Sequence, residues 1–314
     1  MSIDTELTGL HPVLAAAAAK RRTDPQYSQI GIEAARALSL ARQGQPTRLP
    51  EVQSVEDLTV PGAEGLLPAR LYRPSRDPGL PLLVYFHGGG FVAGSLDSHD
   101  SILRRLALES GIAILSVDYR LAPEHPFPAP VEDGAAALRY ALGHPSELGV
   151  SGPVLAGGDS AGAAIALAAS GMVGGIAGLV LFYPVTDLSR VGDTESYRAF
   201  GDGRAGLSLD DMRWFAEQYA PDPASRSDWR CSPLLADPSV RLPPAFVATA
   251  EYDVLRSEGE ALAAQLEQRG IAVAHHAAKG VNHGYLGAGD AVPEAGVTVA
   301  AVAKWIGRGI AAAS

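Results

Sequence analysis

One apolar run restricts the fold of this chain more than any other feature. Residues 80–86, LPLLVYF, are almost continuously apolar, which is the pattern of a strand buried on both faces of a parallel sheet. Three glycines follow directly in HGGGF, residues 87–91. Glycine is costly to order, so a flexible loop is the simplest explanation for an isolated triplet. This triplet, however, follows a buried strand, and ligand sites in parallel sheets lie beyond the carboxyl ends of the strands.

Strands and helices alternate along most of the remaining sequence. Eight segments have the composition of strands: 53–60, 68–73, 80–86, 112–117, 153–157, 177–184, 244–250 and 271–277. Helical stretches separate the later strands and close the chain: 100–110, 130–142, 161–170, 255–269 and 295–310. This alternation predicts an α/β fold with a mostly parallel sheet of about eight strands.

Two parts of the sequence interrupt this alternation and predict a helical cap. Residues 1–50 are rich in helix formers. Between Val185 and Pro244 lie about sixty residues, far more than a crossover needs, so they contain an insertion. We therefore divide the chain into N-terminal helices within 1–50, an α/β domain formed by 51–187 and 232–314, and an inserted cap segment at 188–231.

Composition excludes several classes of partner. Hydrophobic residues make up 47% of the 314 residues and charged residues 19%, which is enough apolar material for a sizeable core. The formal charge of −10 argues against nucleic acid and anionic membranes as partners. A single cysteine, Cys231, cannot form an intramolecular disulfide. Acidic residues precede the first apolar run and basic residues follow it, the reverse of a signal peptide, so we expect a cytoplasmic protein.

A candidate nucleophile lies in the stretch PVLAGGDSAGAAIALAAS, residues 153–170. It reads as a strand, then Gly158-Asp159-Ser160-Ala161-Gly162, then a helix. This is the G-x-S-x-G nucleophile elbow, in which a strained turn exposes the serine hydroxyl. The flanking glycines leave room for that turn, so we assign Ser160 as the nucleophile.

The glycine triplet is the expected partner of such a serine. Acyl transfer builds negative charge on the carbonyl oxygen, and N–H groups must meet that charge. We assign Gly88, Gly89 and Ala161 as the oxyanion-hole donors, with Gly90 allowing the chain to turn. His87 precedes the serine in the chain, and we expect it to anchor the loop rather than to act as the base.

The base is expected after Ser160 and after an acid, because that is the order in this architecture. His275 and His276 lie within the last predicted strand, in IAVAHHAAK. His283 lies between that strand and the final helix, where a loop can carry an imidazole to the serine. We therefore assign His283 as the base.

Two carboxylates compete for the role of the acid. Asp253 follows the strand PPAFVATA, and Asp187 follows the preceding strand. We favour Asp253, whose carboxylate would fix the tautomer of the base. Glu251 is also close to the strand end, and we expect it to brace the turn.

The combined motifs resemble the bacterial hormone-sensitive-lipase-like esterases, also called family IV carboxylesterases. The resemblance covers nearly the whole chain and rests on HGGGF, VDYRLAPEHPFPAP (117–130), GGDSAG, SPLLAD (232–237), AEYDVLRSEGE (250–260) and NHGY. It indicates the GDSAG subgroup. Two positions depart from the family pattern, namely Ala163, where glycine is frequent, and Val254, where proline is frequent. Neither removes a candidate site residue.

The resemblance implies an α/β-hydrolase fold with a helical cap and a serine carboxylesterase that hydrolyses short- to medium-chain acyl esters. It implies the triad Ser160, Asp253 and His283, and no cofactor. An amidase or deacetylase with the same triad is an alternative, and so is a non-catalytic ligand receptor on this fold. We also expect the last strand to lie at a sheet edge, where it would pair with its copy in a homodimer.

Four aromatic residues are candidates for the substrate pocket: Phe91, Trp214, Phe215 and Tyr285. Phe215 also follows helical spacing in LSLDDMRWFAEQYA, so packing within the cap is its alternative role. Trp214 lies off that apolar stripe, either as an exposed ring or as a pocket wall. The stretch GDGRAG, 201–206, matches a dinucleotide fingerprint, but no strand precedes it, and no cluster of residues suggests a metal site.

Overall fold

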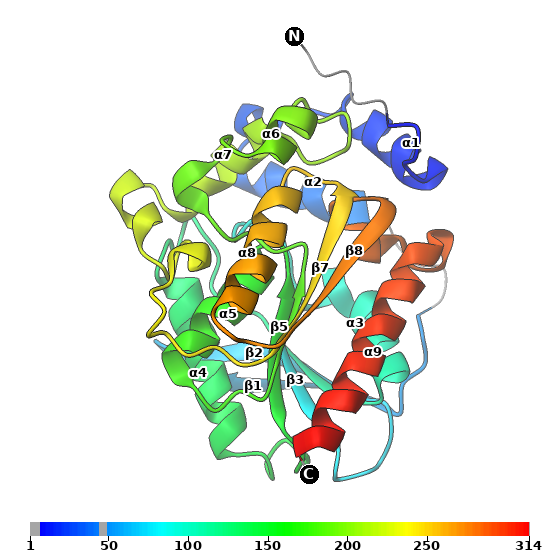
Figure 1. Cartoon of the computed structure of the whole chain (residues 1–314), viewed down its shortest axis with the longest axis vertical. Helices are drawn as coiled ribbons and strands as arrows, with labels where there is room; N and C mark the ends of the chain where they lie inside the picture. Colours follow the sequence, from blue (N-terminus) through cyan, green and yellow to red (C-terminus); the bar gives the residue numbers. More distant parts are fainter. Residues whose placement is uncertain (1–6, 44–48, 314) are drawn as a thin grey trace.

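The computed structural model of the chain describes residues 7–43 and 49–313 and contains one eight-stranded sheet (Figure 1). The strands are β1 (Ser54–Pro61), β2 (Leu66–Arg73), β3 (Leu82–Phe86), β4 (Ala113–Val117), β5 (Val154–Asp159), β6 (Leu179–Phe182), β7 (Ala245–Tyr252) and β8 (Val273–Asn282). Their order across the sheet is β1-β2-β4-β3-β5-β6-β7-β8. The pairs β1/β2 and β2/β4 are antiparallel, and the other pairs are parallel. The predicted α/β fold is thus confirmed.

Helices cover both faces of the sheet. One face carries α4 (Ala129–Gly143), α5 (Ala161–Val173) and α8 (Arg256–Gln268), and the other carries α3 (Leu96–Ser110) and α9 (Pro293–Ala313) (Figure 1). Every residue of the central strands β3, β4, β5 and β6 is buried, which explains their continuous apolar sequences.

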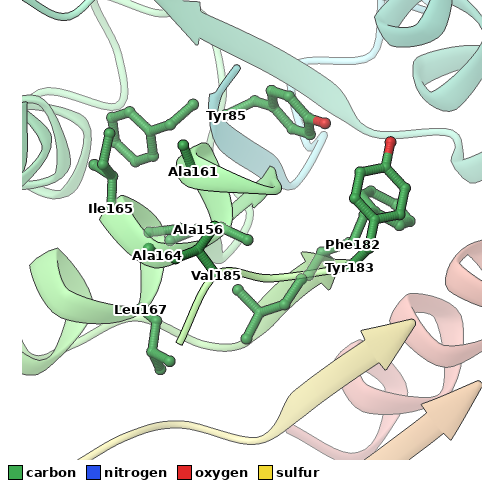
Figure 2. Close-up of a cluster of buried hydrophobic side chains, with 14 of the residues drawn as sticks. Tyr85, Ala156, Ala161, Ala164, Ile165, Leu167, Phe182, Tyr183 and Val185 are labelled. Carbon is green, nitrogen blue, oxygen red and sulfur yellow. The ribbon is translucent and has the colours of Figure 1, made fainter. Parts of the chain in front are cut away.

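The centre of the core is α5, whose first ten residues are all buried. Alanine and glycine dominate this helix, so it packs closely against the strands. An added Cβ at Gly162 would overlap the carbonyl of Phe86 at the end of β3. Figure 2 shows Ala161, Ala164 and Ile165 of α5 close to Ala156 of β5 within this cluster.

Five further helices gather beyond the carboxyl ends of the parallel strands (Figure 1). They are α1 (Pro12–Arg21), the short helix η1 (Tyr27–Gln29), α2 (Ile32–Gln43), α6 (Glu195–Phe200) and α7 (Leu209–Tyr219). We call this group the cap. Arg21 of α1 forms an ion pair with Asp211 of α7 at 3.3 Å, which joins its N-terminal and inserted parts. Residues 1–6 and 44–48 of the predicted N-terminal segment lie outside the described residues.

Strand β8 lies at the edge of the sheet, as expected, and pairs only with β7 within the described chain. It is longer than the predicted segment 271–277 and continues to Asn282. Its pairing with β7 shifts register between Ala250 and Tyr252. The extra length carries His283 directly to the end of the sheet that faces the cap.

Candidate active site

The nucleophile elbow forms where β5 meets α5. Ser160 has φ of 54° and ψ of −119°, a strained conformation for a residue with a side chain. Its N–H donates to the carbonyl of Phe182 at 2.9 Å, and its carbonyl accepts from Val185 N–H at 3.2 Å. These two bonds fasten the elbow to the last residue of β6 and to the segment that follows it.

Three residues from distant parts of the sequence form one hydrogen-bonded chain. Nε2 of His283 lies 2.9 Å from Oγ of Ser160, and Nδ1 of His283 lies 2.8 Å from Oδ2 of Asp253. Asp253 is buried and also accepts the Leu255 N–H at 2.9 Å. The carboxylate can only accept from Nδ1, so Nδ1 carries the proton and Nε2 presents its lone pair to the serine hydroxyl.

The competing acids have other partners. Asp187 caps a short helix, where its carboxylate accepts from Ser189 N–H at 2.9 Å. Glu251 accepts the N–H of Gly280 at 2.8 Å and so ties the end of β7 to β8. The structure therefore brings Asp253, rather than either competitor, to the imidazole.

The other histidines near the end of the chain are also engaged elsewhere. Nε2 of His275 lies 2.9 Å from the hydroxyl of Thr249, and Nε2 of His276 lies 2.9 Å from the carboxylate of Glu294. Both partners are away from the elbow, on β7 and α9.

The glycine loop corrects one of our assignments. The N–H of Gly88 donates to Oδ1 of Asp159 at 2.9 Å, so it does not face a substrate oxygen. In the described part of the chain, the N–H groups of Gly89, Gly90 and Ala161 donate no hydrogen bond. The sequence could not show this, because it depends on the direction in which the Asp159 side chain turns.

Neighbouring segments hold the glycine loop in place. The hydroxyl of Tyr119 donates to the carbonyl of His87 at 2.8 Å, and the two rings stack with centroids 4.5 Å apart. Nδ1 of His87 lies 2.8 Å from the Gly88 carbonyl. His87 is fully buried and anchors the loop, as expected.

Of the four candidate pocket residues, only Phe215 lies against the glycine loop. An added Cβ at Gly90 would overlap the Phe215 ring, so the ring covers this part of the loop. Phe91 is buried and stacks face to face on Tyr219 at 3.7 Å. It therefore joins the loop to the cap instead of lining an open site.

The other two candidates, Trp214 and Tyr285, both have buried rings. Trp214 is buried and stacks on Tyr27 of η1 at 5.5 Å, so it is not an exposed ring. Tyr285 is fully buried, and its hydroxyl lies 2.7 Å from that of Thr298 on α9. Both rings are part of the packing between elements.

Tyr183, which follows β6, is a further residue at the site that the motifs did not indicate. Its ring meets the His283 ring edge to face, with centroids 4.8 Å apart, and its φ is +36°. Its position directly after a buried strand is the sequence signal that could identify it. Figure 2 shows Tyr183 beside Phe182 at the end of β6.

The structure also bears on the dinucleotide motif, on metal binding and on membrane spans. The segment GDGRAG (201–206) follows α6 in the cap, and the Ala205 carbonyl accepts from the amide of Asn282 at 2.6 Å. Within residues 7–43 and 49–313, no group of three His, Cys, Asp or Glu side chains could hold a metal ion. No helix in that part of the chain is long and apolar enough to cross a bilayer.

Comparison with known proteins decides the family. The family model described as alpha/beta hydrolase fold matches residues 83–287, more than half of the chain. The chain belongs to the alpha/beta hydrolase fold family. Several of the similar proteins in this family are named as ester hydrolases.

Ethyl acetate hydrolase of Pseudomonas putida is 35% identical to this alpha/beta hydrolase over 306 residues, covering 94% of this chain and 95% of that protein. Carboxylic ester hydrolase LipN of Mycobacterium tuberculosis is 43% identical over 244 residues, covering 74% of this chain but only 64% of that protein. The solved structure of the Pyrobaculum calidifontis esterase superposes with a TM-score of 0.85 at 36% identity, covering 94% of this chain and 97% of that chain.

Proposed function

We propose that this alpha/beta hydrolase is a serine carboxylesterase of the GDSAG subgroup of hormone-sensitive-lipase-like esterases. The observation that carries the proposal is the hydrogen-bonded chain from Ser160 through His283 to Asp253. The names of the relatives support ester hydrolysis. The subgroup follows from residues 158–162, whose sequence is GDSAG.

The first half-reaction forms an acyl-enzyme. Nε2 of His283 accepts the proton of the Ser160 hydroxyl as Oγ attacks the ester carbonyl carbon. Asp253 stabilises the imidazolium without taking the proton. When the tetrahedral intermediate collapses, the carbon–oxygen bond to the alcohol breaks, and the departing alcohol receives the proton from His283.

The second half-reaction repeats these steps with water. His283 accepts a proton from a water molecule, which attacks the acyl carbon. Collapse of the second tetrahedral intermediate returns the proton to Oγ of Ser160 and releases the carboxylic acid. In both halves, the N–H groups of Gly89, Gly90 and Ala161 supply hydrogen bonds to the negative oxygen.

The cap supports a preference for short- to medium-chain acyl groups. Phe215 covers the glycine loop and is fixed between Tyr27 and Gly90, with the Tyr27 and Phe215 centroids 5.3 Å apart. Such a fixed ring limits the depth available to an acyl chain. Each methylene that fits adds about 0.8 kcal/mol of apolar burial, and methylenes beyond the wall add nothing.

Pre-steady-state kinetics with p-nitrophenyl butyrate test the proposal. We expect hydrolysis of the acyl-enzyme to be the slower step with this activated ester, so p-nitrophenol should appear in a burst equal to the enzyme concentration. The Ser160→Ala variant should lose the burst, and its kcat should fall by about 10⁴-fold or more. Hydrolysis by Ser160→Ala at the wild-type rate would refute the proposal. A wild-type enzyme that cleaves the matching anilide faster than the ester would indicate an amidase.

A further inference from the structure

A second buried histidine–aspartate pair lies behind the glycine loop, outside the hydrogen-bonded chain of the proposed mechanism. Asp159 of β5 and His99 of α3 are both buried, with 7% and 4% of their surfaces exposed. Oδ1 of Asp159 accepts from the Tyr85 hydroxyl at 2.8 Å and from Gly88 N–H at 2.9 Å. Nε2 of His99 lies 3.1 Å from the same oxygen.

The partners of Nδ1 indicate that this nitrogen of His99 carries a proton. The hydroxyl of Ser98 donates to the carbonyl of Ser95 at 2.8 Å. The Ser98 oxygen also lies 2.8 Å from Nδ1 of His99. Because the single hydroxyl proton is used toward Ser95, the oxygen accepts from Nδ1.

The partners of Nε2 indicate a second proton. An unprotonated Nε2 would direct its lone pair at the carboxylate oxygen 3.1 Å away, whereas a protonated Nε2 donates to it. Gly88 N–H lies 3.4 Å from Nε2 and 2.9 Å from Asp159, so its main acceptor is the carboxylate. Both ring nitrogens of His99 therefore face an oxygen that can accept, which is the environment of an imidazolium.

The surroundings of Asp159 favour the charged form of its carboxyl group. Burial by itself would raise the pKa of the Asp159 carboxyl, but the adjacent His99 charge and the hydrogen bonds from His99, Tyr85 and Gly88 hold that pKa below its ordinary value. A buried carboxylate requires a cationic partner or several donors. No lysine or arginine side chain in the described residues forms an ion pair with Asp159, so His99 is the available cation.

The neighbouring His87 does not share the charge. Its Nδ1 lies 2.8 Å from the Gly88 carbonyl, to which it donates, while its Nε2 is buried without a hydrogen-bond partner. A proton on that Nε2 would be unsatisfied, although Asp118 lies 3.7 Å away. The ring centroids of His87 and His99 are only 5.6 Å apart, so two imidazolium ions would repel each other.

We propose that His99 is a protonated positioning residue for the oxyanion hole. Asp159 fastens the first glycine of the loop to the nucleophile elbow, since it precedes Ser160 directly and binds Gly88 N–H. An unpaired negative charge at this place would oppose the negative charge that develops on the substrate oxygen. The positive charge of His99 cancels the negative charge of Asp159, so Asp159 can hold the loop without repelling the substrate oxygen. This inference rests on the proposed serine esterase function.

The protonation state can be measured without any assay of activity. Long-range ¹H–¹⁵N correlation spectra of the whole protein separate imidazolium from the two neutral tautomers, and the His99 signals are assigned by their loss in His99→Gln. We expect two protonated ring nitrogens for His99. A neutral tautomer, with one nitrogen of the unprotonated type, would overturn the proposal even if the enzyme is an active esterase.

Kinetics test whether the charge matters for the reaction. Glutamine at position 99 can still donate a hydrogen bond to Asp159 but carries no charge. We expect His99→Gln to lower kcat by about 10- to 100-fold and to leave KM within about twofold, because the lost charge acts on the transition state. His144→Gln is the matched control, since His144 is exposed at the end of α4, and its kcat should not change.

A double variant separates charge from packing. Asparagine at position 159 keeps an oxygen that can accept from Gly88 but removes the negative charge. We expect Asp159→Asn/His99→Gln to have a higher kcat than His99→Gln alone, by about threefold or more. A double variant that is no faster than the single variant, or a His99→Gln enzyme with wild-type kcat, would show that the pair is only structural. A wild-type enzyme that does not hydrolyse p-nitrophenyl butyrate would instead refute the esterase proposal and leave the spectroscopic result standing.

Discussion

The guanidinium of Arg36 donates from Nε to the carbonyl of Val92 at 2.8 Å, which ties cap helix α2 to the end of the glycine loop. Its Nη2 also donates to the Ala122 carbonyl at 3.1 Å. The fork of the same group binds both oxygens of Glu124, at 2.9 Å and 2.7 Å. One side chain therefore joins the cap to the glycine loop and to the loop that contains Ala122 and Glu124.

This arrangement predicts that Arg36 affects turnover. Arg36→Met removes the bonds to both backbone carbonyls, and we expect kcat to fall by about 10-fold because the loop is no longer held in one position. Glu124→Gln is the control, because it leaves the two carbonyl bonds intact, and its kcat should stay within about twofold of wild type. Steady-state kinetics on both variants measure this. Equal kcat values for Arg36→Met and wild type would show that the loop does not depend on α2.

A second prediction concerns pH and the fully buried Glu258. Its Oε2 accepts from the N–H groups of Thr186 and Asp187 at 2.7 Å and 2.9 Å. Burial nevertheless raises the pKa of this carboxyl from about 4.5 to about 8. The folded state therefore binds a proton that the unfolded state releases between these two pH values, so this group makes the protein less stable as pH rises from about 4.5 to about 8.

Glu258→Gln tests this linkage, because glutamine keeps an acceptor oxygen but does not ionise. Urea unfolding at several pH values gives the free energy of unfolding of both proteins. We expect the wild type to lose stability relative to Glu258→Gln as pH rises through this window. A difference between the two proteins that stays constant with pH would mean that Glu258 is ionised throughout.

Acyl-chain specificity should depend on Phe215 and not on Trp214. For the wild type we expect a preferred acyl chain of about four to eight carbons. Phe215→Ala removes the ring over Gly90, so the preferred acyl chain of this variant should be longer. Trp214→Ala should leave the profile unchanged and lower stability by about 3 kcal/mol, since the Trp214 ring packs on Tyr27. A series of p-nitrophenyl esters measures kcat/KM for each chain length. A longer preferred acyl chain in Trp214→Ala would show that the Trp214 ring lines the acyl pocket.

The exposed edge formed by β8 predicts a two-fold homodimer in which the β8 strands of two copies pair. The edge carries one charged side chain that could oppose pairing, Lys279, and it lies 3.6 Å from the carboxylate of Glu251. Light scattering at micromolar concentration should give twice the monomer mass. Ala277→Lys, at an exposed position of β8, should shift the protein toward monomer. A monomer mass for the wild type would contradict the prediction.

Much of the site could be predicted because it depends on where strands end. Ser160 and His283 each follow a strand of a parallel sheet, and the carboxyl ends of such strands meet at one edge. The order of these elements along the chain is visible in the apolar runs. The fold and the grouping of Ser160, Asp253 and His283 therefore required no knowledge of side-chain direction.

The parts that could not be predicted depend on contacts between distant side chains. Gly88 is not an oxyanion donor because the carboxylate of Asp159 turns toward it. Trp214 is buried because Tyr27, from the N-terminal segment, lies on its ring. Spacing within α7 contains no information about Tyr27, so periodicity could not show which residue covers the Trp214 ring.

Covalent labelling of the nucleophile tests the central claim most directly. The protein is incubated with an alkyl p-nitrophenyl phosphonate, and mass spectrometry locates the adduct while activity is followed in parallel. We predict a single phosphonyl group on Ser160, loss of activity in proportion to labelling, and no adduct on Ser160→Ala. An adduct on another residue with activity retained, or equal labelling of Ser160→Ala, would contradict the assignment of Ser160 as the catalytic nucleophile.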